Sequence, residues 1–385
     1  MSKPPLADLR ILDFSALLPG AVCSLWLADL GAEVIKIEPP VHGEAARGPA
    51  GTPPGGLFHL TNRNKKSLAL DLKEAAAIAT LHQLVESADA VLESFRPGVM
   101  ARLGLDYPTL RAINPRLVYC SLTGYGQSGP LAARAGHDIN YQAVAGVLGQ
   151  NVVDGSRPSP GSTPLADMAG GGLSAAVAML AALFDAQRSG IGRHIDIAMA
   201  DCTMALNLMP LAGQMLRGGQ APVPGCDLLS GGLPCYRTYA TADGRHLAVG
   251  ALEHKFWRAF CQAIGRPDLE PRGWDMGEQL AATVAEIAAT IASKTLAEWQ
   301  AILADIDACA TPVPSLAEAL AHPQAQARAM VIEVAGGGAT TTQYALPIRM
   351  SDFAFAVQLP PPHIGQHNGE ILAALAALAG PASHT

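Results

Sequence analysis

Apolar and polar positions near the start of the chain follow the pattern of a strand, a helix and a second strand. Leu9–Phe14 predicts a short buried strand. Ala21–Leu30 carries apolar residues at 22, 25, 26 and 30, which is the spacing of one helix face, and Gly31 supplies a stop. Glu33–Ile37 predicts the second strand. A strand–helix–strand unit of this length implies parallel strands.

The same alternation recurs further along the chain. Ile78–Ser87 has helical spacing, and strands are expected at Ala88–Glu93 and Leu117–Leu122. A long helix rich in alanine, methionine and leucine is expected over about 170–187, followed by a strand at His194–Ala198. The pattern therefore predicts an α/β fold with a doubly wound, Rossmann-like parallel sheet.

A second domain is indicated by a change of composition, because glycine and proline are frequent over 215–235. We expect a large domain over 1–200, a linker over 201–224 and a smaller α+β domain over 225–330.

Local signals place several elements toward the C-terminus. Arg245–Val249 predicts a strand, and capping-box spacing predicts helix starts at Thr295 and Ser315. The stretch 334–345, with its three glycines and three threonines, predicts a loop.

The overall composition narrows the function classes. The chain has 385 residues, 49% of them hydrophobic, which is typical of a globular protein with a large core. The net charge of −7 argues against a nucleic-acid partner. Seven cysteines without a C-x-x-C pair predict free thiols and no metal site. No signal peptide or spanning helix is recognised, so a cytoplasmic enzyme without a membrane partner is expected.

One motif suggests a dinucleotide site and is better explained otherwise. Residues 124–129 match G-x-G-x-x-G directly after a predicted strand. That fingerprint requires the glycines to open a helix, whereas Pro130 follows the last glycine and another glycine comes soon after. The segment is therefore predicted to be a turn.

Reactive side chains gather at three places. Gly136, His137, Asp138 and Tyr141 fall in one polar loop. Asp167 precedes three consecutive glycines at the start of the long helix, and the third place is Glu253, after the strand of the smaller domain. Each has a common alternative role, since a lone histidine is often structural, an aspartate before a helix is often an N-cap, and a loop glutamate is often solvated. Four basic residues are candidates for phosphate binding or ordinary surface charges: Arg63, Lys66, Arg96 and Arg102.

At these same residues the sequence resembles the family III CoA-transferases, and within that superfamily it is most similar to the α-methylacyl-CoA racemases. The similar segments are spread over nearly the whole chain: 27–38, 66–72, 95–99, 114–119, 123–130, 135–141, 165–167, 242–244, 307–313 and 364–367. The resemblance implies a large Rossmann-like domain completed by 335–385, a smaller domain, and an interlocked homodimer. It also implies an acyl-CoA thioester substrate, with coenzyme A as part of the substrate and no separate cofactor.

The resemblance also assigns roles to individual residues. In racemases the residues matching Asp167 and His137 act as acid and base, and the residue matching Glu253 orients the histidine. Two such groups, one on each side of a planar enolate, interconvert (R)- and (S)-2-methylacyl-CoA by 1,1-proton transfer. In the transferases of the family, the carboxylate matching Asp167 is instead a nucleophile that carries CoA as a thioester on its way to a free carboxylic acid. The remaining residues that the family pattern places at the substrate are Arg63, Lys66, Ala69, Leu70, Asp71, Leu72, Arg96, Arg102, Gly136, Asp138 and Tyr141.

Some positions depart from the racemase pattern. Pro39 stands where the family commonly has an arginine at the adenine end of CoA, so either Lys36 or another basic residue replaces it or CoA binds differently. Ser230, His254 and Lys255 also differ, at positions expected near the acyl group. Gln142 and the alanine after it are more similar to the transferases.

Overall fold

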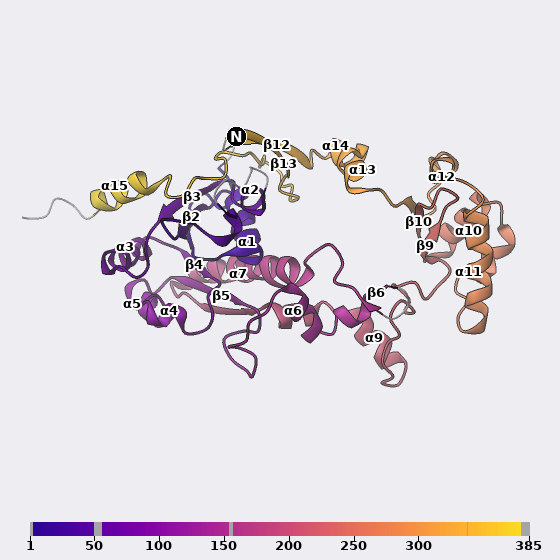
Figure 1. Cartoon of the computed structure of the whole chain (residues 1–385), viewed down its shortest axis with the longest axis horizontal. Helices are drawn as coiled ribbons and strands as arrows, with labels where there is room; N and C mark the ends of the chain where they lie inside the picture. Colours follow the sequence, from indigo (N-terminus) through magenta and orange to yellow (C-terminus); the bar gives the residue numbers. More distant parts are fainter. Residues whose placement is uncertain (1–2, 50–55, 154–156, 337, 379–385) are drawn as a thin grey trace, which may run out of the picture. The chain divides into compact units, whose positions relative to one another are not determined.

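The computed structural model describes residues 3–49, 56–153, 157–336 and 338–378 (Figure 1). The chain forms two compact units. The first contains 1–145, 162–206 and 323–385, and the second contains 146–161 and 207–322. The first unit therefore includes the C-terminal segment. The stretch 146–161, expected in the large domain, belongs instead to the second unit.

The first unit is built on a six-stranded parallel sheet with the order β3-β2-β1-β4-β5-β8. This is the doubly wound arrangement that the alternating pattern predicts, with the order reversing between β1 and β4. Its strands are β1 (Arg10–Asp13), β2 (Glu33–Glu38), β3 (Lys65–Ala69), β4 (Ala90–Glu93), β5 (Val118–Thr123) and β8 (His194–Ala198).

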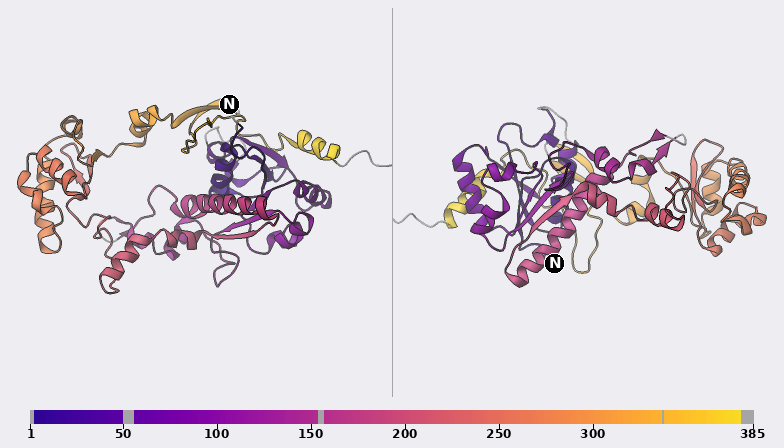
Figure 2. Two further views of the ribbon diagram at one scale, coloured as in Figure 1. Left: turned by 180° about the vertical axis from the view of Figure 1, so that it is seen from behind. Right: turned by 90° about the horizontal axis from the view of Figure 1, so that it is seen from below.

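Alternate strand residues face opposite layers of helices. Ile11, Val34 and Ala90 pack with α1 (Leu17–Asp29) and α7 (Ser174–Ser189). Their neighbours, including Leu12 and Ile35, pack with the helices of the other face. Those helices are α3 (Ala75–Glu86), α4 (Val99–Arg102), α5 (Tyr107–Ile113) and α15 (Asn368–Leu378). Figure 2 shows the long helix α7 beside the sheet. The remaining short elements of this unit are η1 (Ala45–Arg47), α2 (Leu57–Thr61), α6 (Asp138–Val144), α8 (Met199–Ala205) and α14 (Pro323–Ala327).

The long helix begins earlier than its sequence predicts. Residues 166–173 form a π-helix, η3 (Ala166–Leu173), that continues directly into α7. By length and composition, the combined helix Ala166–Ser189 is apolar enough to cross a membrane. In this fold Ala175, Met179 and Leu183 are instead buried in the core between α1 and the sheet.

One expectation about local structure is wrong. The stretch 334–345 is not a loop, because β12 (Val331–Gly336) and β13 (Ala339–Tyr344) pair as an antiparallel hairpin. The three consecutive threonines of β13 have strand propensity, but the glycines before them hide the pattern.

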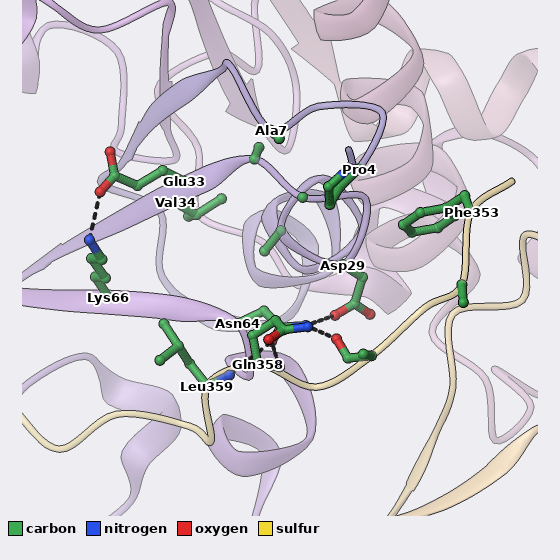
Figure 3. A pocket seen from close by; sticks show the side chains of 15 residues that line it. Pro4, Ala7, Asp29, Glu33, Val34, Asn64, Lys66, Phe353, Gln358 and Leu359 are labelled. Atoms are coloured by element: carbon green, nitrogen blue, oxygen red, sulfur yellow. Dashed lines mark hydrogen bonds and ion pairs between the residues drawn. The ribbon is translucent and has the colours of Figure 1, made fainter. Parts of the chain in front are cut away.

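A pocket of about 330 Å³ lies at the amino ends of β2 and β3, under the returning segment 353–359 (Figure 3). Hydrogen bonds of Asn64 hold this segment in place. Its Oδ1 accepts from the backbone N of Gln358 at 2.7 Å, and its Nδ2 donates to Asp29 at 2.8 Å. Lys66 forms an ion pair with Glu33 at 2.7 Å, which joins the two strands.

The second unit has its own core around a three-stranded antiparallel sheet, β11-β10-β9. Both predicted capping boxes are confirmed, with Thr295 and Ser315 each accepting from the glutamate backbone three residues later. The elements are η2 (Leu148–Gln150), β6 (Val152–Val153), β7 (Arg157–Pro158), α9 (Leu208–Leu216), β9 (Tyr236–Ala240), β10 (His246–Gly250), α10 (His254–Ala263), η4 (Pro267–Arg272), α11 (Glu278–Ile291), α12 (Leu296–Leu303), β11 (Ala310–Pro312) and α13 (Leu316–Ala321).

Candidate active site

A cleft of about 330 Å³ lies at the carboxyl edge of the parallel sheet. It is lined by the segments that follow β1, β4 and β5, including Leu17, Arg96 and Tyr125. The strand order reverses between β1 and β4, and in doubly wound sheets ligands bind in the crevice at this point. Gly136, His137, Tyr141 and Asp167 line the same cleft, so the structure brings together residues from two of the three places singled out in the sequence.

His137 is the N-cap of α6, with an extended backbone at φ −129° and ψ 175°. Its backbone N donates to Oδ1 of Asn140 at 3.0 Å, which fixes the entry into the helix. The imidazole is exposed and lines the cleft. The polar loop of the sequence is therefore a helix start that presents a histidine to the cleft.

Packing against Tyr141 explains why glycine occupies two positions of the sequence motifs. Its hydroxyl donates to the carbonyl of Gly136 at 2.5 Å, and its ring packs edge-on against Tyr125. A Cβ on Gly124 would lie 2.2 Å from the Tyr141 ring, and one on Gly136 would lie 2.7 Å from it. Both glycines are therefore required by packing against this ring, and the G-x-G-x-x-G segment is a turn, as predicted.

Asp167 is the second residue of the π-helix and is not an N-cap. The three glycines after it let that helix approach its neighbours closely. A Cβ on Gly170 would lie 2.3 Å from Oγ1 of Thr203 on α8, and one on Gly172 would lie 2.9 Å from the carbonyl of Pro19 on α1. The glycines thus serve helix packing, and π-helical segments often occur at functional sites.

The environment of Asp167 raises its pKa toward neutrality. Burial and, after it, the negative charge of Asp138 raise the pKa of Asp167 to about 6, against the opposing effect of His137. A carboxyl group with such a pKa can give or accept a proton near neutral pH, and the imidazole of His137 lines the same cleft.

Two features of the cleft were not found from the sequence. Arg134 lines it beside Arg96, although it lies in a loop whose composition carries no signal of function. Leu17 also lines it and has a left-handed backbone with φ 65°. A non-glycine residue in this conformation is strained, and such strain clusters at functional sites.

The other predicted CoA-binding residues separate into two groups. Ala69 ends β3, and 70–72 follow it at the carboxyl edge of the sheet, where Arg102 ends α4. The structure does not bring Arg63 and Lys66 to this edge, because they lie at the amino end of β3. Arg63 is buried and paired with Asp29, and Lys66 contacts Glu33 and Glu370.

Lys36 does not replace the arginine missing at Pro39. Its side chain is fully buried and contacts Glu44 at 2.6 Å and Asp13 at 3.8 Å. Its Nζ also donates to the carbonyl of Ser15 at 2.8 Å, beneath the segment that leads to Leu17. The lysine is therefore part of the core and contacts the segment just before Leu17.

Glu253 belongs to the second unit, where it is the exposed N-cap of α10. The next residue, His254, packs its ring against Trp274 at 4.0 Å between centroids. Ser230 lies in a loop that lines two pockets of this unit, of about 540 and 570 Å³. The pairing of Glu253 with His137 stays a prediction.

Within the described ranges, no three His, Cys, Asp or Glu side chains converge where an ion could bind.

Comparison with known proteins identifies the family. The profile of CoA-transferase family III matches residues 6–368. The chain belongs to CoA-transferase family III. It is 36% identical to human alpha-methylacyl-CoA racemase over 372 residues, covering 95% of this chain and 92% of that protein. It is also 33% identical to the succinate–glutarate CoA-transferase of Agrobacterium fabrum, covering 97% and 96%.

The family fold is seen in a solved relative. The crystal structure of a CAIB/BAIF family protein from Brucella suis superposes with a TM-score of 0.81 at 29% identity, covering 97% of this chain and all of that one. Family III enzymes act on acyl-CoA, so this chain is an enzyme of acyl-CoA chemistry. Its relatives divide between racemases and CoA-transferases.

Proposed function

We propose that this enzyme interconverts (R)- and (S)-2-methylacyl-CoA thioesters by cofactor-independent proton transfer through an enolate. The observation that carries the proposal is the presence of His137 and Asp167 on one cleft, with the pKa of Asp167 raised to about 6. One group removes the α-proton and the other returns a proton to the opposite face. A carboxyl group with a pKa near neutrality can either accept or give a proton, so the two groups can exchange these roles.

Backbone N–H groups near the start of α6 are proposed to stabilise the enolate oxygen. The N–H of Asp167 donates to Oδ1 of Asp138 at 3.0 Å, and that of His137 donates to Asn140 at 3.0 Å. The N–H of Asn140 donates to the carbonyl of His137 at 2.8 Å, so the N–H groups of Asp138 and Ile139 are the proposed donors. Loss of one such donor typically costs ~10²–10³ in rate.

Arginines at the carboxyl edge are proposed to bind the CoA phosphates. Arg96 lines the cleft directly, and Arg102 follows it on α4. Residues 69–72 lie along the same edge and are proposed to contact the adenosine end.

From the resemblance to the racemases, we propose that Glu253 orients His137 during the reaction.

The alternative is a CoA-transferase that carries CoA on Asp167. Relatives with transferase names support this alternative. Gln142 also supports it, because the sequence at this position is more similar to the transferases than to the racemases. That reaction needs a free carboxylic acid as acceptor and forms an aspartyl-CoA thioester that hydroxylamine traps.

Incubating the purified enzyme with one enantiomer of a 2-methylacyl-CoA in D₂O, without free acid, tests the proposal. Epimerisation with incorporation of deuterium at the α-carbon is expected, and His137→Ala should reduce it ~10²–10⁴-fold. No exchange with the wild-type enzyme, followed by CoA transfer once carboxylic acids are added, would instead establish the alternative.

We also propose that the enzyme is a homodimer and that it is located in the cytoplasm. Helix α9 is one surface that a second chain would cover, because Leu208, Leu211, Met215 and Leu216 are all more than half exposed. Contiguous exposed apolar surface of this kind marks interaction sites in soluble proteins.

A further inference from the structure

The carboxylate of Asp138 is held by three donors of the protein itself. Its Oδ1 accepts from the backbone N of Ala166 at 2.7 Å and from that of Asp167 at 3.0 Å. Its Oδ2 accepts from Nε2 of Gln142 at 2.5 Å. Gln142 is 1% exposed and lies one turn further along α6, so its amide holds the carboxylate in place. Asp138 was expected to bind CoA, and these contacts direct it to the protein instead.

The two backbone donors are the first N–H groups of the π-helix. Groups at this position have no acceptor within their own helix, and a helix N-terminus favours a negative charge. The carboxylate of Asp138 satisfies both donors at once. Since one of them belongs to Asp167, the contact fixes the backbone from which the Asp167 side chain enters the cleft.

The charge of Asp138 acts on the same residue. The titratable groups that face Asp167 are Asp138, His137 and Tyr141, and the guanidinium groups of Arg96 and Arg134 line the same cleft. Of these, the negative charge of Asp138 opposes ionisation of Asp167, after the larger effect of burial, and His137 favours it. Asp138 thus affects both the position of Asp167 and its proton affinity.

We propose that Asp138 is a positioning residue for Asp167: its carboxylate holds the start of the π-helix and places a negative charge beside Asp167. This inference rests on the proposed function for its catalytic consequence. Its structural part holds for either reaction, because a nucleophilic Asp167 would need the same fixed backbone.

Two variants separate the hydrogen bonds from the charge. Asp138→Asn keeps an oxygen that accepts from both backbone N–H groups, and Gln142 can rotate its amide to match the new NH₂ group. It therefore removes the charge alone. Asp138→Ala removes both the charge and the acceptor.

The titration of Asp167 is measured by NMR on protein labelled with ¹³C at aspartate carboxyl carbons, with Asp167→Asn to identify the signal. In Asp138→Asn we expect the pKa of Asp167 to fall by about one unit, the scale of a nearby charge, with the melting temperature near that of the wild type. An unchanged titration in Asp138→Asn would overturn the proposal. This readout needs no activity, so it stands even if the enzyme proves not to be a racemase.

Kinetics supply the second test. Asp138→Ala is expected to lower kcat for α-proton exchange ~10²-fold with KM for the acyl-CoA nearly unchanged, because a misplaced catalytic group loses rate without losing binding. In Asp138→Asn the acid limb of the pH–rate profile should shift to lower pH, together with the pKa of Asp167. A raised KM with kcat intact in Asp138→Ala would make the residue a CoA ligand and contradict the proposal. If Asp138→Ala does not fold, the titration of Asp167 and the pH–rate profile in Asp138→Asn decide the question.

Discussion

Arg63 and Asp29 form a buried ion pair, with 2.6 Å between Nη2 of the guanidinium and Oδ2 of the carboxylate. The two residues are 2% and 4% exposed. The same guanidinium donates from Nη1 to Oε1 of Gln343 at 2.9 Å, on strand β13. The pair therefore links the end of α1 to the C-terminal hairpin, and it accounts for an arginine that the family pattern had placed at CoA.

Replacement of Arg63 is expected to destabilise the fold without acting on substrate binding. Arg63→Ala leaves Asp29 buried without its cation, which typically costs about 3–5 kcal/mol. Urea unfolding should show this loss. Arg96→Ala is the matched variant, for which we expect unchanged stability and a roughly tenfold higher KM for the acyl-CoA, the worth of one charge-assisted contact. A raised KM at full stability in Arg63→Ala would return that residue to the CoA site.

Asp167 is expected to lower folding stability above neutral pH. Its pKa in the folded protein is about 6 against an ordinary value of 3.8, so the folded state binds the proton more tightly. Stability therefore falls as the pH rises from about 4 through 6. We expect Asp167→Asn to raise the free energy of unfolding by about 1–2 kcal/mol at pH 8, allowing for partial solvation, and by almost nothing at pH 4.

Thermal melts at the two pH values measure this difference. Asp305→Asn, at an exposed position of the second unit, is the control and should leave the melting temperature unchanged at both. An equal gain at pH 4 and pH 8 for Asp167→Asn would show that ionisation is not its cause.

Gly124 is expected to tolerate no side chain. A Cβ there would lie 2.2 Å from the ring of Tyr141, so Gly124→Ala must displace a residue that lines the cleft. We expect a loss of about 1–3 kcal/mol together with reduced activity. Gly149→Ala, where a Cβ would meet nothing within 4 Å, should change neither. Wild-type activity and stability in Gly124→Ala would mean that the ring moves freely.

The proposed homodimer is expected to bury the exposed face of α9. Leu211 and Met215 are 55% and 73% exposed, one helical turn apart. The double substitution Leu211→Glu and Met215→Glu should shift the protein from dimer to monomer in light scattering coupled to size exclusion. Val41→Glu, at another exposed apolar residue, should leave the dimer intact. A dimer that survives the double substitution would place the interface elsewhere.

Elements with strong local signals were predicted closely from the sequence. The strand at His194–Ala198 has the predicted bounds, and both capping boxes begin helices where expected. The doubly wound sheet also follows from local patterns, since strand and helix periodicities repeat along the chain. The hairpin β12–β13 was missed because its glycines and threonines resemble a loop.

The sequence by itself determined the α/β class, the parallel sheet and the candidate residues His137 and Asp167, because periodicity, caps and motifs depend on near neighbours in the chain. Only the tertiary structure decided the partners of these residues. Arg63 meets Asp29 across 34 positions and Asp138 meets Ala166 across 28, through contacts that no local pattern records. Burial and charge at such contacts set the proton affinity of Asp167, and both arise only when distant segments pack together.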